Sequence, residues 1–195
     1  MGFLRDYCDV FPYNGETSPQ SRPFSCGDSE LDYFFLHDAT KYERQLLGKS
    51  YCFRLNSDRS VVVCVFTLSN SSIDARNLPN NRKRKLTANV PYEKSLSSYP
   101  AALIGRLGVD RAFGSQGIGT ELIEFIKQWM LLPANKAACR YLTVDAYNSE
   151  SALKFYEMND FKPIFSSDRQ EKEHIGLPKE KELKTRLMYF DLMMA

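Results

Sequence analysis

The sequence predicts a single domain over residues 1–195, of the α/β or α+β class, built on a mixed β-sheet. Helical periodicity comes first, several strand-like segments follow, and strands then alternate with helices up to a last strand. A chain of 195 residues is long enough for one domain with a sizeable core. The short turn at Asn56 to Ser60 indicates a hairpin, whereas a purely parallel sheet would need a crossover between every pair of strands.

The first half of the chain is predicted to hold a helical region followed by strands. Apolar residues recur three or four positions apart between Asp28 and Leu47, which is typical of one helix or two abutting helices. Asp28 can cap the start of this region, and Gly48 can end it. Tyr51 to Leu55 alternates like a half-buried strand, and Val61 to Leu68 is a β-branched apolar run typical of a buried strand.

The second half is predicted to begin with a long polar excursion and to continue as strands and helices. Asn70 to Tyr99 is interpreted as a surface excursion, because it is polar and contains two prolines. The elements expected after it are a strand at Ala101 to Val109, a helix burying Ile118, Leu122, Phe125, Ile126 and Trp129, a strand at Tyr141 to Ala146, a helix at Ser149 to Asn159, a short strand at Phe161 to Phe165, a charged connection at Asp168 to Lys184 and a last strand at Thr185 to Leu192.

Composition is that of a globular protein and excludes several classes. The chain is 43% hydrophobic and 26% charged, with a net charge of +2, so a nucleic-acid surface would need local clustering of basic residues. No signal peptide is visible, and no apolar run reaches the ~18 residues that cross a bilayer. The five scattered cysteines support neither a zinc site nor a disulfide framework, so no metal is expected and the cytoplasm is the expected location.

The glycine-rich stretch from Arg111 to Leu122 carries the strongest functional signal. It follows an apolar strand and opens an amphipathic helix, so its unpaired backbone N–H groups and the helix dipole favour a phosphate. A P-loop would need a lysine before Thr120, and that lysine is missing. A dinucleotide-binding fingerprint would need a third glycine where Leu122 stands, although Asp145 could mimic its ribose-binding acid.

Two motifs resemble the GNAT superfamily of N-acetyltransferases. Leu107 to Asp110 followed by Gly114 to Gly119 is similar to the acetyl-CoA-binding motif, and Asn148 to Phe161 is similar to the second signature, an Asn followed by a helix with Phe-Tyr. The resemblance implies a central mixed, mostly antiparallel sheet of about six or seven strands, flanked by helices and splayed around acetyl-CoA. Gly114 stands where the family has Gln or Arg, so the phosphate cradle would rely on backbone N–H groups, with Gln116 in partial compensation.

A narrower resemblance points to the GNAT toxins of toxin–antitoxin modules. It is carried by Phe24 to Phe35, by Leu46 to Tyr51 and by Tyr99-Pro100 ahead of Ile104 to Asp110. This resemblance implies acetylation of the free α-amino group of aminoacyl-tRNA, inhibition by a small ribbon-helix-helix antitoxin, and a homodimer. No membrane partner is implied.

The resemblance assigns roles to residues of both motifs. Tyr156 is the candidate acid that stabilises the leaving thiolate, against the alternative that it is a core aromatic beside Phe155. The oxyanion would be stabilised by backbone N–H groups around Leu107, Gly108 and Val109, and Gly108 could equally be a packing glycine. The pyrophosphate would lie on Gly114, Ser115, Gln116, Gly117, Ile118, Gly119 and Thr120, and the pantetheine would contact Asn148 and Ser151, unless Asn148 or Ser149 is a plain helix cap.

The acceptor is the least constrained part of this prediction. No general base stands out, since His37 and His174 are isolated, but an α-amino group with a pKa of about 7.7–8.0 is partly neutral at pH 7. Arg106 and the run Arg82, Lys83, Arg84 and Lys85 could bind an RNA backbone, or the run could be a solvated basic loop. The alternatives are a protein N-terminal or small-molecule amine N-acetyltransferase, and a non-catalytic CoA-binding module.

Overall fold

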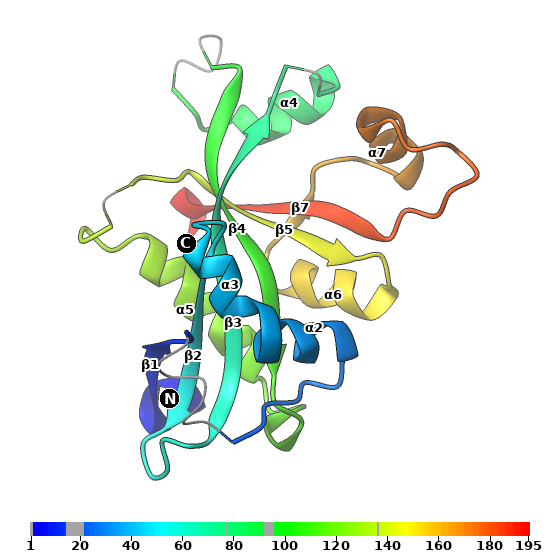
Figure 1. Cartoon of the computed structure of the whole chain (residues 1–195). Coiled ribbons are helices and arrows are strands. Elements are labelled where there is room, and N and C mark those ends of the chain that lie inside the picture. Colours follow the sequence, from blue (N-terminus) through cyan, green and yellow to red (C-terminus); the bar gives the residue numbers. More distant parts are fainter. Residues whose placement is uncertain (1, 15–21, 77, 92–95, 136) are drawn as a thin grey trace. The chain divides into compact units, whose positions relative to one another are not determined.

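The computed structural model describes residues 2–14, 22–76, 78–91, 96–135 and 137–195. Within them, seven strands form one sheet in the order β1-β2-β3-β4-β5-β7-β6 (Figure 1). The pairs β1–β2, β2–β3, β5–β7 and β6–β7 are antiparallel, and β4–β5 is parallel over three residue pairs, Ala101 to Leu103 against Tyr141 to Thr143. This mixed, mostly antiparallel sheet flanked by helices confirms the predicted fold class.

The chain divides into two compact units, Met1–Asn70 with Ile104–Trp129 and Ser71–Leu103 with Met130–Ala195. The long strands β3 (Val62–Asp74) and β4 (Ser98–Val109) contribute residues to both units. The other elements of the first unit are α1 (Phe3–Tyr7), β1 (Cys8–Pro12), α2 (Ser29–Tyr33), the π-helical turn η2 (Phe34–Asp38), α3 (Ala39–Arg44), β2 (Lys49–Leu55), the 3₁₀ turn η4 (Arg111–Phe113) and α5 (Ile118–Met130).

Helices of the first unit pack against both faces of strand β2. Side chains alternate along a strand, so Cys52 of β2 faces one side while its neighbours Tyr51 and Phe53 face the other. Cys52 packs in a cluster with residues of the α2–α3 region, including Phe35. The aromatic rings of Tyr51 and Phe53 instead contact Trp129 and Phe125 of α5. Of the predicted buried stripe, Ile118, Leu122 and Ile126 are buried, whereas Phe125 and Trp129 are half-buried. The helices therefore cover opposite faces of β2, and the predicted buried hairpin is confirmed.

The helical region between Asp28 and Leu47 differs from its prediction at its end. Asp28 caps α2 by accepting the backbone N–H groups of Glu30 and Leu31 at 2.9 and 3.1 Å, as predicted. The predicted stop at Gly48 is wrong, because α3 ends at Arg44 and the left-handed residue is Leu46, with φ 57°. Gly48 serves packing, since a Cβ there would lie 2.4 Å from Ser69 Oγ. Strand β1 was missed altogether.

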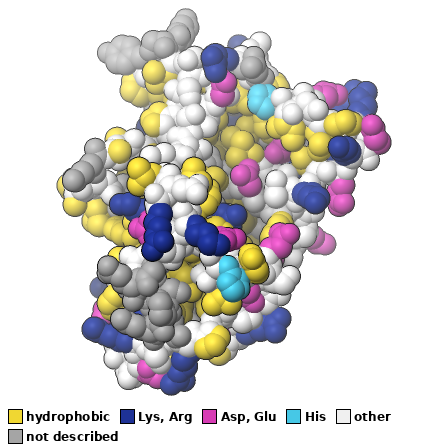
Figure 2. All heavy atoms as spheres, in the orientation of Figure 1, with side chains coloured by type: hydrophobic (Ala, Val, Ile, Leu, Met, Phe, Trp, Pro, Cys, Tyr) yellow, Lys and Arg dark blue, Asp and Glu magenta, His cyan; other side chains and the backbone are white. Residues whose placement is uncertain are grey.

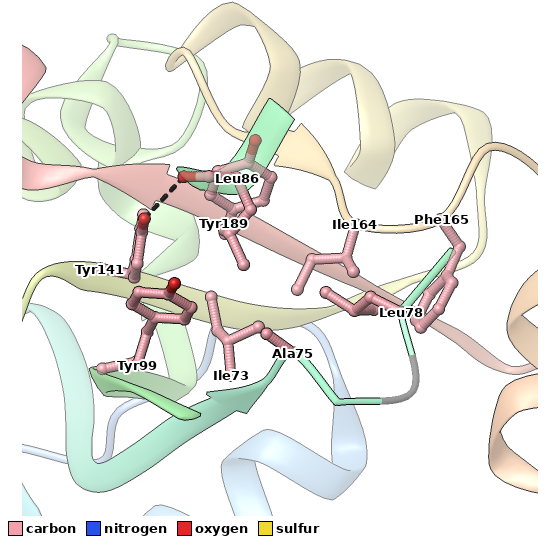
Figure 3. Close-up of a cluster of buried hydrophobic side chains, with 10 residues drawn as sticks. Ile73, Ala75, Leu78, Leu86, Tyr99, Tyr141, Ile164, Phe165 and Tyr189 are labelled. Carbon is pink, nitrogen blue, oxygen red and sulfur yellow. Dashed lines mark hydrogen bonds between the residues drawn. The ribbon is translucent and has the colours of Figure 1, made fainter. Parts of the chain in front are cut away.

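The second unit holds the ends of β3 and β4 and a set of short elements. A cluster of buried side chains joins α4 to one face of its strands, and Figure 3 shows the Tyr141 hydroxyl donating a hydrogen bond to the Leu86 carbonyl at 2.7 Å. On the other face, Phe161 contacts both Phe190 and Tyr156 of α6. The elements are α4 (Asn80–Thr87), β5 (Tyr141–Tyr147), α6 (Glu150–Met158), β6 (Lys162–Pro163), α7 (Asp168–Ile175), β7 (Thr185–Asp191) and the 3₁₀ turn η5 (Leu192–Met194).

Two stretches interpreted as irregular are structured. The polar stretch 70–99 contains the end of β3, helix α4 and the start of β4, so its interpretation as a surface excursion is wrong; residues 77 and 92–95 of it lie outside the described part. The charged connection 168–184 contains α7, which Ser167 caps and Gly176 ends with φ 70°. The strand predicted at 161–165 is only Lys162–Pro163.

Candidate active site

The glycine turn has the backbone geometry of an anion-binding concavity. Ser115 and Gly117 have positive φ angles of 61° and 79°, while Gln116 between them does not. Alternating backbone conformations of this kind turn successive N–H groups toward a common point, which attracts anions. A Cβ added at Gly117 would meet no atom within 4 Å, so the space beside it is open. The turn then enters α5, a helix of 13 residues with its positive dipole end at this point.

The start of the turn is fixed by hydrogen bonds to the segment before α2. Asp110 caps η4 by accepting the Ala112 N–H at 2.9 Å, and its second oxygen accepts the Ser25 N–H at 3.1 Å. The Arg111 N–H donates in turn to the Ser25 carbonyl at 2.9 Å. The residues that lead into the turn are thereby tied to the stretch around Ser25.

Gly108 lies at a closely packed position of β4. A Cβ at this position would lie 3.1 Å from side-chain atoms of both Phe24 and Cys26. The neighbours Leu107 and Val109 are half-buried in the last part of β4. Arg106 precedes them with its guanidinium 3.7 Å from the centre of the Phe34 ring, a cation–π contact that holds its charge against the helical region.

The remaining residues of the predicted cradle differ in exposure. Gly114, Ser115, Gln116, Gly117 and Thr120 are exposed, Gly119 is half-buried, and Ile118 is buried in the core. The Gln116 amide donates to the Ala112 carbonyl at 3.5 Å, so this hydrogen bond is weak.

Glu121, in the first turn of α5, holds the start of α1. Its carboxylate accepts the N–H groups of Phe3 and Leu4 at 2.9 and 2.8 Å.

The second predicted motif lies at the connection from β5 to α6. Ser149 is the N-cap of α6 and accepts the Ala152 N–H, so the cap interpretation holds for Ser149. Asn148 is not a cap, because its side-chain amide donates to the Asp168 carboxylate at 2.8 Å and to the Leu183 carbonyl at 2.9 Å. Ser151 is exposed in the first turn of α6. Asp168 and Leu183 were not foreseen as partners, since nothing local to Asn148 indicates them.

Tyr156 lies on α6 among aromatic rings. Its ring centre is 5.1 Å from that of Phe155 and 5.5 Å from that of Phe161. Burial raises the pKa of Tyr156 to about 12. The phenol therefore keeps its proton throughout the neutral pH range and can act as a hydrogen-bond donor there.

The basic run predicted for RNA contact lies on α4, and its four members differ. Arg82 donates hydrogen bonds to the carbonyls of Pro163 and Ile164, so its side chain ties α4 to the segment around β6. Lys83 is half-buried, whereas Arg84 and Lys85 are exposed. Figure 2 shows basic and acidic side chains interspersed over the face that it draws, in agreement with the balanced charge of the chain.

Other catalytic chemistries find no support in the described part of the chain. All five cysteines are free, and burial raises the pKa of Cys26 to about 11, so its thiol is a poor nucleophile at neutral pH. No group of three or more His, Cys, Asp or Glu side chains that could hold a metal occurs among the described residues. None of the helices in the described segments is long and apolar enough to cross a membrane.

The mixed, mostly antiparallel sheet flanked by helices is the architecture that the resemblance to the GNAT superfamily implies. Residues 87–163 match the family described as the acetyltransferase (GNAT) domain. The matched segment contains both predicted motifs, and the match supports the predicted acetyltransferase class and acetyl-CoA as the donor.

Solved structures of similar fold cover almost the whole chain. A tyrosine-to-phenylalanine mutant of KacT is 16% identical with a TM-score of 0.72, and the match covers 97% of each chain. AtaT complexed with acetyl-methionyl-tRNAfMet is 18% identical with a TM-score of 0.70, covering 96% of each chain. AtaTR bound with AcCoA is 18% identical with a TM-score of 0.61, covering 97% of this chain and 96% of the other.

Proposed function

We propose that this protein is an acetyl-CoA-dependent N-acetyltransferase that acetylates the α-amino group of aminoacyl-tRNA. The observation that carries the proposal is the glycine turn at Gly114 to Thr120, with positive φ at Ser115 and Gly117, which opens α5 inside the segment that matches the GNAT domain. The finer choice of acceptor is supported by the fold neighbour AtaT, which was solved with acetyl-methionyl-tRNAfMet.

The turn would hold the pyrophosphate of acetyl-CoA through main-chain groups. The positive φ values of Ser115 and Gly117 and the open space beside Gly117 fit a phosphate that approaches the backbone closely. Leu107 to Val109, as the end of β4, would pair with the pantetheine arm in the manner of an added strand. Asn148 and Ser151 would contribute side-chain contacts to the same arm.

Acetyl-CoA supplies a thioester, whose C–S bond breaks as the acceptor nitrogen forms the new C–N bond and releases its proton to solvent. Tyr156 would donate a hydrogen bond to the departing sulfur. With its pKa near 12 and a thiol near 8.5, full proton transfer would be uphill by roughly 5 kcal/mol. Tyr156 therefore acts by a hydrogen bond that strengthens as sulfur gains charge, and the thiolate takes its proton from water after release.

An α-amino acceptor does not depend on a dedicated general base. Its pKa of about 7.7–8.0 leaves a fair fraction neutral at pH 7, whereas a lysine side chain near 10.4 would need a base. Arg84 and Lys85 are the exposed members of the basic run that would contact the RNA backbone, with Lys83 beside them and Arg82 holding the helix in place. Arg106 would stay at its aromatic contact and add positive charge.

The partners in this proposal are those of the toxin class. AtaT has been solved bound to the C-terminus of the antitoxin AtaR, and KacTA has been solved with DNA. We infer for this chain a small ribbon-helix-helix antitoxin, a homodimer and a cytoplasmic location.

The test is acetyl transfer from labelled acetyl-CoA to charged tRNA, with uncharged tRNA as the control. Label on the charged tRNA alone supports the proposal, and turnover should fall when Lys83, Arg84 and Lys85 are replaced together by Gln. Peptide N-termini and polyamines are assayed in parallel. Label on either of these, with none on charged tRNA, would exclude the tRNA acceptor while keeping the acetyltransferase. Binding of acetyl-CoA without transfer to any acceptor would support the alternative of a non-catalytic CoA-binding module.

A further inference from the structure

Asn148 is held by two hydrogen-bond acceptors from a distant stretch of the chain. Its Nδ2 donates to Asp168 Oδ2 at 2.8 Å and to the Leu183 carbonyl at 2.9 Å. Its backbone N–H donates to the Lys184 carbonyl at 2.8 Å. Asp168 lies 20 residues further along the chain, in the first turn of α7. The connection from β5 to α6 is thereby tied to both ends of the segment 168–184.

These partners fix which way the Asn148 amide points. A carboxylate and a backbone carbonyl can only accept, so the amide atom that faces them must be the NH₂ group. Both of its protons are then used inside the protein. Within the described part of the chain, the carbonyl oxygen Oδ1 is the atom that Asn148 can still offer to a ligand, and Oδ1 accepts hydrogen bonds.

Asp168 is itself fixed by a buried arginine. Arg186 of β7 donates to Asp168 Oδ1 at 2.6 Å, to Glu171 Oε2 at 2.6 Å and to the Phe165 carbonyl at 3.0 Å. The second oxygen of Glu171 accepts the Leu187 N–H at 2.7 Å. Arg186 and Glu171 are 9% and 3% exposed, so this pair is shielded from solvent, whereas the Asp168 side chain at its edge is 48% exposed.

We infer that Asp168 is a positioning residue of the acetyl-transfer site. Anchored by Arg186, it occupies one proton of the Asn148 amide, so that Asn148 presents an acceptor oxygen to an N–H donor of the ligand. The matching donor is an amide N–H of the pantetheine arm, because an amide of fixed orientation selects a donor over an acceptor. This inference rests on the proposed function of the β5–α6 connection as part of the acetyl-CoA site.

Asp168 can be changed without leaving a charge unpaired. The three charged groups are Arg186, Glu171 and Asp168, so neutralising Asp168 leaves the buried Arg186–Glu171 pair intact. Asp168 accepts from Arg186 with one carboxylate oxygen and from Asn148 with the other, whereas the amide of Asp168→Asn has only one oxygen. The NH₂ group of that amide would therefore face a donor of Arg186 or of Asn148. This conflict is relieved only if Asn148 reverses its own amide and loses the hydrogen bond to Leu183.

The experiment is a double-mutant cycle on acetyl-CoA affinity, measured by calorimetry on the full chain. Asp168→Asn and Asn148→Ala should each raise the dissociation constant about tenfold. The double variant should also bind about tenfold more weakly than the wild type, since Asp168 acts through Asn148. A dissociation constant about a hundredfold higher in the double variant would show that the two residues act independently and would overturn the inference. Unchanged affinity of Asp168→Asn would overturn it too.

A control variant separates positioning from the stability of α7. Ser167→Ala removes the N-cap of the same helix, whose hydroxyl accepts the Gln170 N–H, and leaves Asp168 in place. It should lower the melting temperature with no change in acetyl-CoA affinity. A loss of affinity in Ser167→Ala equal to that in Asp168→Asn would contradict a positioning role. The wild-type measurement tests the proposed function by itself. If the wild-type chain binds no acetyl-CoA, the proposed function is wrong, whatever the variants show.

Discussion

Two regions carry the proposed chemistry by different means. The turn at Gly114 to Thr120 is built from main-chain groups, with positive φ at Ser115 and Gly117 and a helix dipole behind them. The region from Asn148 to Tyr156 depends on side chains that α7, β7 and the core around Phe161 hold in place. A main-chain site tolerates changes of side chain, whereas a side-chain site depends on every partner that orients it.

The largest expected effect is the loss of stability on replacing Arg186, the anchor of the side-chain region. Arg186→Leu leaves Glu171, which is 3% exposed, without its cation, and such a loss costs about 3–5 kcal/mol in the free energy of unfolding. For a chain of this size we expect the melting temperature to fall by about 10 °C or more, measured by calorimetry.

A matched replacement next to the turn should do much less. Arg111→Leu changes an exposed side chain, for which losses of about 0.5 kcal/mol or less are usual. Equal losses of stability in the two variants would remove the contrast between a region built from side chains and one built from the main chain.

The second largest expected effect is the loss of turnover on replacing Tyr156. Tyr156→Phe removes the hydroxyl that stabilises the leaving sulfur, so we expect kcat to fall at least tenfold with little change in acetyl-CoA affinity. Because the pKa of Tyr156 is near 12, the wild-type rate should rise with pH as the acceptor amine loses its proton and should not fall again below about pH 10. Full activity of the variant would mean that another group acts as the acid.

The same contrast explains what the sequence could predict. The turn, α5 and the cap at Ser149 depend on residues close together in the sequence, and the structure has them where they were predicted. Helix α4 was missed because Leu86 is its one strongly apolar residue, and the cluster that buries Leu86 comes from distant segments. Helix α7 did carry a local signal, Ser167 as an N-cap that accepts the Gln170 N–H and Gly176 at the end, which the polar composition obscured. The partners of Asn148 carry no local signal at all.

The third expected effect is a loss of acetyl-CoA affinity on replacing Gly117, which tests the main-chain site at Gly114 to Thr120. Gly117→Ala puts a Cβ on a residue with φ 79°, which costs about 1–2 kcal/mol, and places it in the space proposed for the phosphate. We expect the dissociation constant for acetyl-CoA to rise about tenfold. Gly105→Ala is the control, because its Cβ also meets no atom within 4 Å but its φ is not positive.

Deletion of a side chain from the same turn sharpens the result. Gln116→Ala should change acetyl-CoA affinity less than about threefold, since only the main chain of the turn is proposed to bind. A tenfold loss in Gln116→Ala would instead assign the binding to the Gln116 amide.

The smallest effect concerns Asp145, which lies on β5 three positions before Asn148. Neighbouring atoms partly desolvate the carboxyl of this exposed residue and raise its pKa, so the folded state binds a proton more readily there than the unfolded state does. Stability is therefore lost as the pH rises through the window between the unfolded pKa, about 3.9, and the higher folded one. Asp145→Asn should raise the free energy of unfolding at pH 7 by less than about 1 kcal/mol, because the exposed side chain is screened by solvent. The gain should vanish below pH 4 in a series of thermal melts; a variant that is destabilised at pH 7 would show that the carboxylate has a partner in the side-chain region.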